Sequence, residues 1–223
     1  MVLILLRNTL ESKVRVVFNM LKNFIVFILC FVNFSVFADS CVVYKGIPKI
    51  NILNPVYKTN VVLSDEPMDK YHGNVLATLI EDYDIVVDIF SSDGGYCVVL
   101  KSVDALIGYN DFSVKIDISN NRGSCSYNAI LNHEKKHIDA YLSVIKDLQS
   151  DIENSVFNSA NSVMPIFVQS REDIDFAIEE INHKMTNHPE SILMKQKINA
   201  AQEIRNKRVD QNEDNSELIS CYY

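Results

Sequence analysis

The sequence predicts an α+β protein in which a mostly antiparallel β region is followed by a long helix and then by further helices. Two observations carry this prediction. Short apolar runs separated by Pro, Gly and Asp fill residues 39–124, which is typical of strands joined by turns. From Cys125 onward, apolar residues recur every three or four positions, which is the spacing of amphipathic helices. Strands first and helices second is the order of an α+β fold.

The beginning of the chain is expected to lie outside the folded domain. Residues 20–38 are predicted to be a secretory signal peptide, because a short basic start at Met20–Asn23 precedes the unbroken apolar run Phe24–Val32. Val36–Ala38 then fits the small-residue cleavage rule. A membrane anchor is the alternative, but the run is short for crossing a bilayer. Residues 1–19 are interpreted as a non-native upstream extension, and we expect no stable membrane insertion after cleavage.

Length, composition and charge narrow the classes of protein further. The chain has 223 residues and is 48% hydrophobic, enough for one domain with a sizeable core, predicted at 39–211. Strands are expected over 39–124, helices over 125–211 and a polar tail over 212–223. Signal cleavage removes four of 21 basic and one of 29 acidic residues, which leaves a net charge of −11. Such an acidic surface argues against a nucleic-acid partner. Nothing in the sequence indicates the oligomeric state.

The cysteine count predicts disulfide bonds. Cys41, Cys97, Cys125 and Cys221 remain after signal cleavage, and an even number in an exported protein predicts two disulfides with three possible pairings. We favour Cys97–Cys125 with Cys41–Cys221, because a bridge at Cys125 would tie the first helix to the preceding strands. A four-cysteine zinc site is disfavoured because the chain has no C-x-x-C pair.

The strand region is divided by Pro, Gly and Asp into several short predicted strands. Val114, Ile116 and Ile118 alternate with Lys115, Asp117 and Ser119, which indicates a strand with one solvated face. The other predicted strands are Val42–Tyr44, Ile50–Leu53, Val61–Leu63, Val75–Ile80 (which fits a helix equally well), Ile85–Phe90 and Cys97–Leu100.

The longest predicted helix contains the run His133-Glu134-Lys135-Lys136-His137. Gly123-Ser124 supplies a turn and an N-cap before it, and no Pro or Gly interrupts Ser126–Ile152. Positions i and i+4 lie on one face of a helix, so both imidazoles can bind one zinc ion while Glu134 reaches a water in an open position. The flanking apolar residues at helical spacing are Ile130, Leu131, Ile138, Tyr141, Leu142, Ile145, Leu148 and Ile152.

A catalytic zinc site needs three protein ligands and an open position. His133 and His137 supply two ligands, and Glu134 would act as the general base toward the metal-activated water. The third ligand is left open. Its candidates lie on a helix predicted over 171–187, away from that helix's apolar stripe, and are Glu179, Glu180 and His183.

The neighbouring positions have simpler interpretations. Asp139 is expected to be a surface charge, and Tyr141 is expected to pack in the core, although it could also orient His137 or stabilise an oxyanion. The last helix is predicted over Glu190–Val209, with a frayed polar segment from Asp210 onward. A solvated histidine pair that binds no metal is the alternative interpretation of the motif.

The motif helix resembles the active-site helix of the zincin superfamily of zinc metallopeptidases. The run Ser124–His137, which follows the strand-like Val114–Ile118, is also similar to small secreted bacterial H-E-x-x-H proteins of uncharacterised role. The resemblance covers about residues 97–145 and implies a zinc site that acts on peptide or protein substrates. It also suggests that Ser113–Ser119 pairs with an extended substrate, unless it is an ordinary interior strand. The chain lacks the third histidine of the metzincins and the G-T-x-D run of the aspartate-type branch.

The sequence therefore predicts an exported zinc-dependent peptidase, periplasmic or secreted, that hydrolyses amide bonds. The alternative is an exported, disulfide-stabilised binding protein whose H-E-x-x-H helix is not catalytic. Neither the substrate nor a cleavage preference can be read from the residues.

Overall fold

The computed structural model describes residues 41–66, 73–212 and 220–221. The predicted signal peptide and upstream extension, and most of the predicted tail, lie outside these residues. Contacts divide the chain into two compact units, which are described separately. The described residues of the smaller unit are 41–45, 89–99 and 164–174, and the larger unit contains the others.

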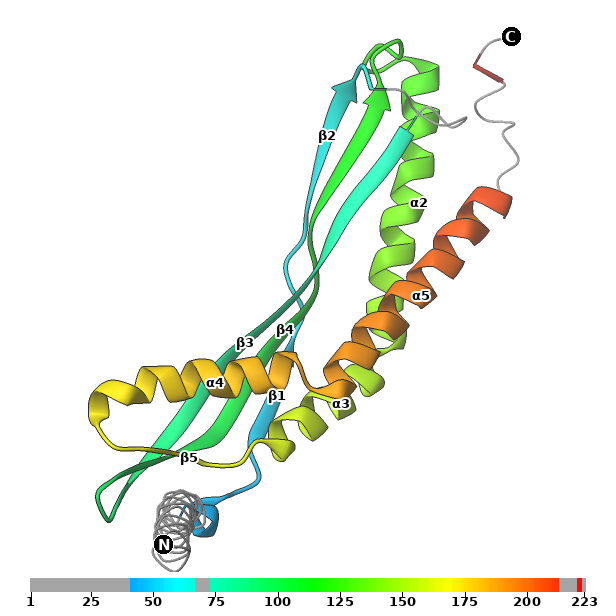
Figure 1. Ribbon diagram of the computed structural model, residues 1–223. Coiled ribbons are helices and arrows are strands. Elements are labelled where there is room, and N and C mark those ends of the chain that lie inside the picture. The colour runs from blue at the N-terminus through cyan, green and yellow to red at the C-terminus, as the bar shows by residue number, and fades with distance from the viewer. Residues whose placement is uncertain (1–40, 67–72, 213–219, 222–223) are drawn as a thin grey trace, which may run out of the picture. The chain divides into compact units, whose positions relative to one another are not determined.

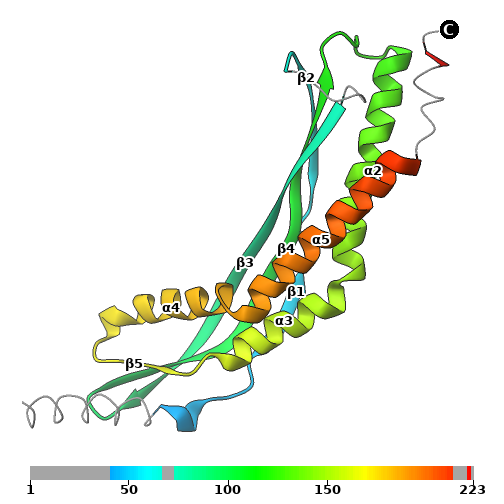
Figure 2. The same cartoon turned by 45° about the vertical axis from the view of Figure 1, so that its right-hand side comes forward.

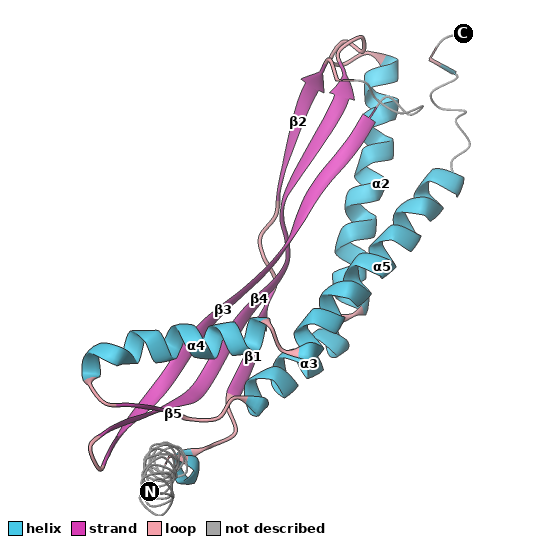
Figure 3. Ribbon diagram, in the orientation of Figure 1, coloured by secondary structure: helices cyan, strands magenta, loops and turns pink. Residues whose placement is uncertain are grey.

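The described chain forms strands and then mainly helices, which is an α+β composition (Figure 3). The elements in order are the 3-10 turn η1 (Val42–Tyr44), β1 (Lys49–Leu53), β2 (Lys58–Ser64), β3 (Gly73–Ser92), β4 (Gly95–Asp117), α2 (Cys125–Asp147), α3 (Gln149–Ser162), β5 (Ile166–Val168), the 3-10 turn η2 (Arg171–Asp173), α4 (Ile174–Thr186) and α5 (Pro189–Asn212).

The sheet is built around β4, and its strand directions correct the predicted fold class. Both β1 and β2 pair with β4 in parallel, with Leu53 opposite Leu106 and Lys58 opposite Asp111. The prediction of a mostly antiparallel β region is therefore wrong. Apolar alternation identifies a strand but carries no information about its direction. The direction is set by β3, which returns the chain through the two-residue turn Asp93-Gly94 so that β4 runs the same way as β1 and β2.

Several predicted short strands are parts of two long ones. Val75–Ile80 and Ile85–Phe90 both belong to β3, and β4 contains Cys97–Leu100 as well as the alternating residues from Val114. Gly108 lies inside β4 with a φ of 149° rather than ending a strand. A Cβ at Gly108 would lie 3.0 Å from Cδ of Pro55, so this glycine leaves room for the segment that joins β1 to β2. Val42–Tyr44 is a 3-10 turn and not a strand.

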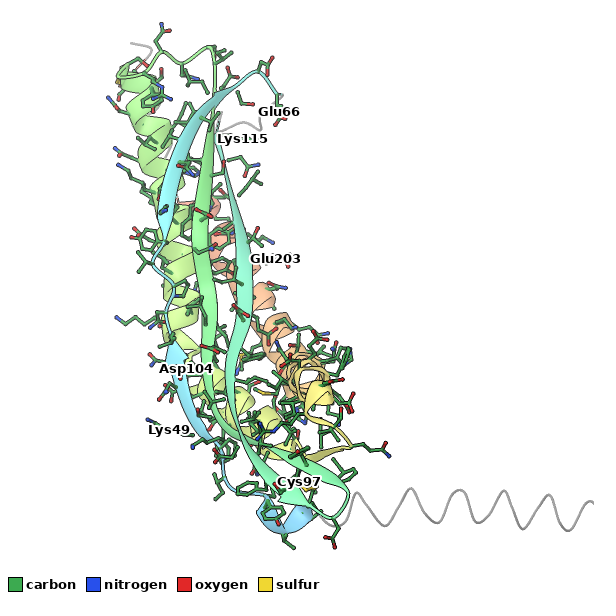
Figure 4. All side chains as sticks on the ribbon, turned by 90° about the vertical axis from the view of Figure 1, so that its left-hand side faces the viewer. Lys49, Glu66, Cys97, Asp104, Lys115 and Glu203 are labelled. Carbon is green, nitrogen blue, oxygen red and sulfur yellow. A yellow bond between two sulfur atoms is a disulfide. The ribbon has the colours of Figure 1, made fainter. Side chains whose placement is uncertain are left out.

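The core of the larger unit lies between β4 and α2. Phe112, Val114 and Ile116 are completely buried, whereas Lys115 on the other face is partly exposed and forms a 2.5 Å ion pair with Glu66 (Figure 4). The predicted alternation is confirmed as far as Asp117, but Ile118 lies beyond the end of β4 and is 57% exposed. The α2 and β3 residues that join this cluster are Val75, Tyr127, Ile130, Ile138 and Tyr141.

The same sheet shows that Ser113–Ser119 is not a free edge. Ser113 is opposite Asn60 of β2, and β4 pairs with β3 as well. A substrate strand cannot add to an interior strand whose backbone groups are already paired. The suggested role of this segment in substrate pairing is therefore wrong.

The last helix lies alongside α2 in both ribbon views (Figures 1 and 2). Its side chains contact α2 in reverse order, because Arg205 binds Asp147 and Ser143 whereas Asp210 approaches His137. The two helices are therefore antiparallel. Ile198 is the fully buried apolar residue of the described part of α5, and the contacts of its C-terminal half are mostly polar.

Two disulfides are present, as predicted, but the favoured pairing is wrong. Cys41 is bonded to Cys97 in the smaller unit, and Cys125 to Cys221 in the larger one. Cys97 lies near the start of β4 in the smaller unit and Cys125 begins α2 in the larger unit, and each cysteine is bonded within its own unit. In the smaller unit, Cys97 also pairs with Phe167 of β5.

No helix in the described part of the chain combines the length and apolar character needed to span a membrane.

Candidate metal centre

The motif residues lie on α2, which begins as the sequence predicts. Gly123 has a φ of 81°, and the hydroxyl of Ser124 accepts the backbone N–H of Tyr127 at 3.1 Å, which caps the helix. Two turns further on, His133 and His137 face each other, with 3.1 Å between their Nε2 atoms. The helix therefore places two ring nitrogens at one point.

The third donor at this point is Asp210 of α5. Its Oδ1 lies 3.2 Å from Nε2 of His137 and 3.6 Å from Nε2 of His133. Within the described part of the chain, these three residues form the one group of at least three His, Cys, Asp or Glu side chains able to hold a metal ion. Two helices that are separate in sequence thus contribute to a single site.

The spacing of the three donors fits a tetrahedral metal. A metal with ligand bonds of about 2.0–2.1 Å places its donors about 3.3 Å apart, and the three observed separations run from 3.1 to 3.6 Å. The two histidine side chains are 6% and 12% exposed, whereas that of Asp210 is 40% exposed. The triangle is therefore nearly buried on the α2 side and open to solvent beside Asp210.

Asn206, one turn before Asp210, lies against the other ring nitrogen of His137. Its Oδ1 lies 3.3 Å from Nδ1 of His137. An amide oxygen only accepts hydrogen bonds, so a His137 ring that binds a metal through Nε2 would donate its Nδ1–H to Asn206. A cation bound here would be coordinated by the histidine nitrogens and the Asp210 carboxylate oxygen, and the hydrogen bond to Asn206 would orient the His137 ring.

A line of polar contacts continues from Asn206 away from the site. The hydroxyl of Tyr141 interacts with Asn206 and Gln202, while Tyr109 donates to Oε1 of Gln202 at 2.6 Å. Burial raises the pKa of Tyr141 despite these hydrogen bonds, and burial also raises that of Tyr109. The Tyr141 ring packs edge-on against Tyr109 with centroids 4.9 Å apart. Tyr141 thus packs in the core, as expected, and also contacts the residue that orients His137.

Glu134 lies beside the triangle in sequence but on another side of the helix. It is 2% exposed, and its carboxylate lies against the backbone of Gly73, the first residue of β3. This places the predicted general base at the contact between α2 and the sheet.

The candidates for a third ligand on α4 do not join the site. Glu179, Glu180 and His183 are exposed, and Glu180 forms a 2.7 Å ion pair with Lys184 one turn away. None of the three belongs to the described metal-binding group. Asp139 is exposed, as expected for a surface charge.

Asp210 was missed because the segment beginning there was predicted to fray, whereas α5 continues to Asn212. One signal could have indicated it. Gln202, Asn206 and Asp210 repeat every four residues, which puts three polar side chains on one face of a helix with few apolar residues. Such a helix must pack through polar contacts if it packs at all.

Comparison of the chain with family models, curated protein sequences and solved structures gives no match. The fold and the site therefore define the class directly: an α+β protein with a group of two histidines and an aspartate that could bind a metal ion. Its two disulfides indicate an oxidising compartment.

Proposed function

We propose that the protein is an exported, periplasmic or secreted zinc-dependent peptidase that hydrolyses amide bonds in peptide or protein substrates. His133, His137 and Asp210 hold the zinc ion, and Glu134 is the general base. The observation that carries the proposal is the triangle of donor atoms, whose sides of 3.1, 3.2 and 3.6 Å match three corners of a zinc tetrahedron. Two imidazoles and one carboxylate leave the fourth corner open, which a catalytic zinc site requires.

A bound zinc ion would supply Lewis acidity and lower the pKa of a water in the open position to about 7. Glu134 accepts a proton from the attacking water and later delivers it to the leaving amine nitrogen. Asn206 keeps the His137 ring in the tautomer whose Nε2 can bind metal. The exposed side of the Asp210 carboxylate marks the direction from which substrate approaches.

An extended substrate could pair with the edge of β3, which lies next to Glu134. Among the described strands, β3 pairs only with β4, and its first residue, Gly73, contacts the Glu134 carboxylate. A peptide that hydrogen-bonds to the other edge of β3 would pass the general base. In this proposal β3 takes the role that the sequence had suggested for Ser113–Ser119.

The first test is metal analysis of the purified mature protein, which should contain about one equivalent of zinc. The second compares Glu134→Gln with wild type on a peptide library. The variant should keep its metal and lose turnover, because the glutamine amide has no basic oxygen for the water proton. Glu203→Gln, at an exposed position of α5, is the matched control and should remain active. Protein without bound metal, or full turnover by Glu134→Gln, contradicts the proposal.

A second candidate is an exported, disulfide-stabilised binding protein whose motif helix is not catalytic. The burial of Glu134 against β3 favours this candidate, because a side chain that is only 2% exposed can have a structural role between α2 and β3. The two candidates give opposite results in the library assay. Metal bound without turnover by either wild type or variant would support the binding protein.

A further inference from the structure

Gly73, the first residue of β3, lies directly against α2. A Cβ built on Gly73 would lie 2.5 Å from Oε1 and 3.0 Å from Cδ of Glu134, and 2.7 Å from Cγ2 of Ile130. Separations under 3.0 Å are not tolerated between such atoms, so something must shift if a side chain is added. The carboxylate of Glu134 thus occupies the space that any residue other than glycine would need at position 73.

This contact is buried on both sides, which limits how it can relax. Gly73 and Glu134 are both buried, and Ile130 is 2% exposed within the core cluster of the larger unit. Ile130 also packs with Val75, two residues along β3. The carboxylate is the far end of the Glu134 side chain, whereas the helix and strand backbones are held by their own hydrogen bonds. An added methyl group would therefore displace the carboxylate first.

We infer that Gly73 is a positioning residue for Glu134: its missing side chain leaves the space that the carboxylate occupies between α2 and β3. This inference rests on the proposed function for its catalytic consequence. The steric part stands independently of catalysis. A general base must lie within hydrogen-bond reach of the proton it takes, so a small displacement of the carboxylate lowers the rate without removing the metal.

The steric part is tested by a double-mutant cycle on thermal stability. Gly73→Ala should lower the Tm of the wild-type protein by about 3–10 °C, as overpacking does in a chain of this size. In a Glu134→Ala background the same change should cost less than half as much, because the carboxylate is gone and Ile130 can move into the vacated space. Gly46→Ala is the matched control, because a Cβ at Gly46 meets nothing within 4 Å. If Gly73→Ala alone fails to fold while the double variant folds, the contact is equally demonstrated.

The positioning part is tested by kinetics and metal content. Gly73→Ala should retain one equivalent of zinc and a wild-type KM while kcat falls about 10- to 100-fold. Equal Tm losses in the two backgrounds, or a Gly73→Ala variant with wild-type kcat, overturn the inference. These failures differ from failure of the proposed function, because that would appear as full turnover by Glu134→Gln, whatever Gly73 does.

Discussion

The amide oxygen of Asn206 lies 3.3 Å from Nδ1 of His137, so a residue of α5 fixes the ring of a residue on α2. The same helix supplies Asp210 one turn later, 3.2 Å from the other nitrogen of that ring. Both nitrogens of His137 are therefore engaged from one helix. The residues that could bind a metal therefore also form part of the contact between α2 and α5. A substitution that weakens this contact should also weaken metal binding.

The first prediction concerns Asn206. Asn206→Ala removes the acceptor for Nδ1–H of His137, and loss of such an outer partner typically weakens metal binding about 10- to 100-fold. Competition with a chelator of known affinity measures the change. Asn206→Asp, which retains an acceptor oxygen, should bind within a few-fold of wild type. Equal weakening by both variants would show that the hydrogen bond is not the reason.

The second prediction distinguishes Asp210 from the residues that the sequence had suggested. Asp210→Ala removes one of three ligands and should abolish near-stoichiometric zinc retention on gel filtration. Added zinc should also no longer raise the Tm of the variant. A ligand raises the Tm only when it binds the folded state, and the variant's folded state would have lost its affinity for zinc. Glu180→Ala and His183→Ala should leave both properties unchanged, since these side chains are exposed on α4. Loss of zinc in either α4 variant would refute the assignment of Asp210.

Local sequence signals predicted the cap of α2 and parts of the strands, but neither the full length of β3 and β4 nor the pairing of the strands. The cap at Ser124 and the strand alternation of Val114 and Ile116 depend on neighbouring residues and were confirmed. The direction of β1 against β4 and the partner of Cys97 depend on where distant segments meet, which periodicity does not encode.

The same division explains the candidate site. His133 and His137 are four residues apart on one helix, so their shared face follows from helix geometry. Asp210 is 73 residues beyond His137 and reaches the site only because α5 packs antiparallel to α2. A single sequence contains no short-range pattern that links the two helices.

The third prediction concerns the disulfide of the larger unit. Cys125 is the first residue of α2, and Cys221 follows the helix that carries Asp210, so the bond closes a loop that contains all three donors. Replacing both cysteines with serine should lower the free energy of unfolding by about 2–4 kcal/mol. It should also weaken zinc binding, because Asp210 is then less restrained near the histidines.

The other disulfide provides the control. Replacing Cys41 and Cys97 with serine should lower stability in the same range but leave zinc affinity unchanged, since neither cysteine belongs to the unit that holds the donors. Chelator competition on both double variants, with unfolding followed by circular dichroism, measures the two quantities. Equal effects on zinc affinity would mean that general stability, rather than the tether, controls the site.

The last prediction concerns alkaline pH. Burial raises the pKa of Tyr109, whose hydroxyl donates to Gln202. In the unfolded chain this tyrosine loses its proton near pH 10, whereas the folded protein keeps it. Above that pH the folded state therefore binds more protons than the unfolded state, so the free energy of unfolding falls as pH rises, by up to about 1.4 kcal/mol per pH unit for this residue.

Tyr109→Phe removes this titration together with its hydrogen bond. The variant should be about 1 kcal/mol less stable than wild type at neutral pH, and its stability should fall less steeply above pH 10, so that the two curves converge. Urea unfolding of metal-free protein between pH 8 and about 11 measures both effects. Tyr57→Phe, at a position that is 48% exposed, is the control and should follow the wild-type curve. Parallel curves for Tyr109→Phe and wild type would show that the Tyr109 hydroxyl ionises equally readily in both states, and that its contact with α5 does not hold the proton.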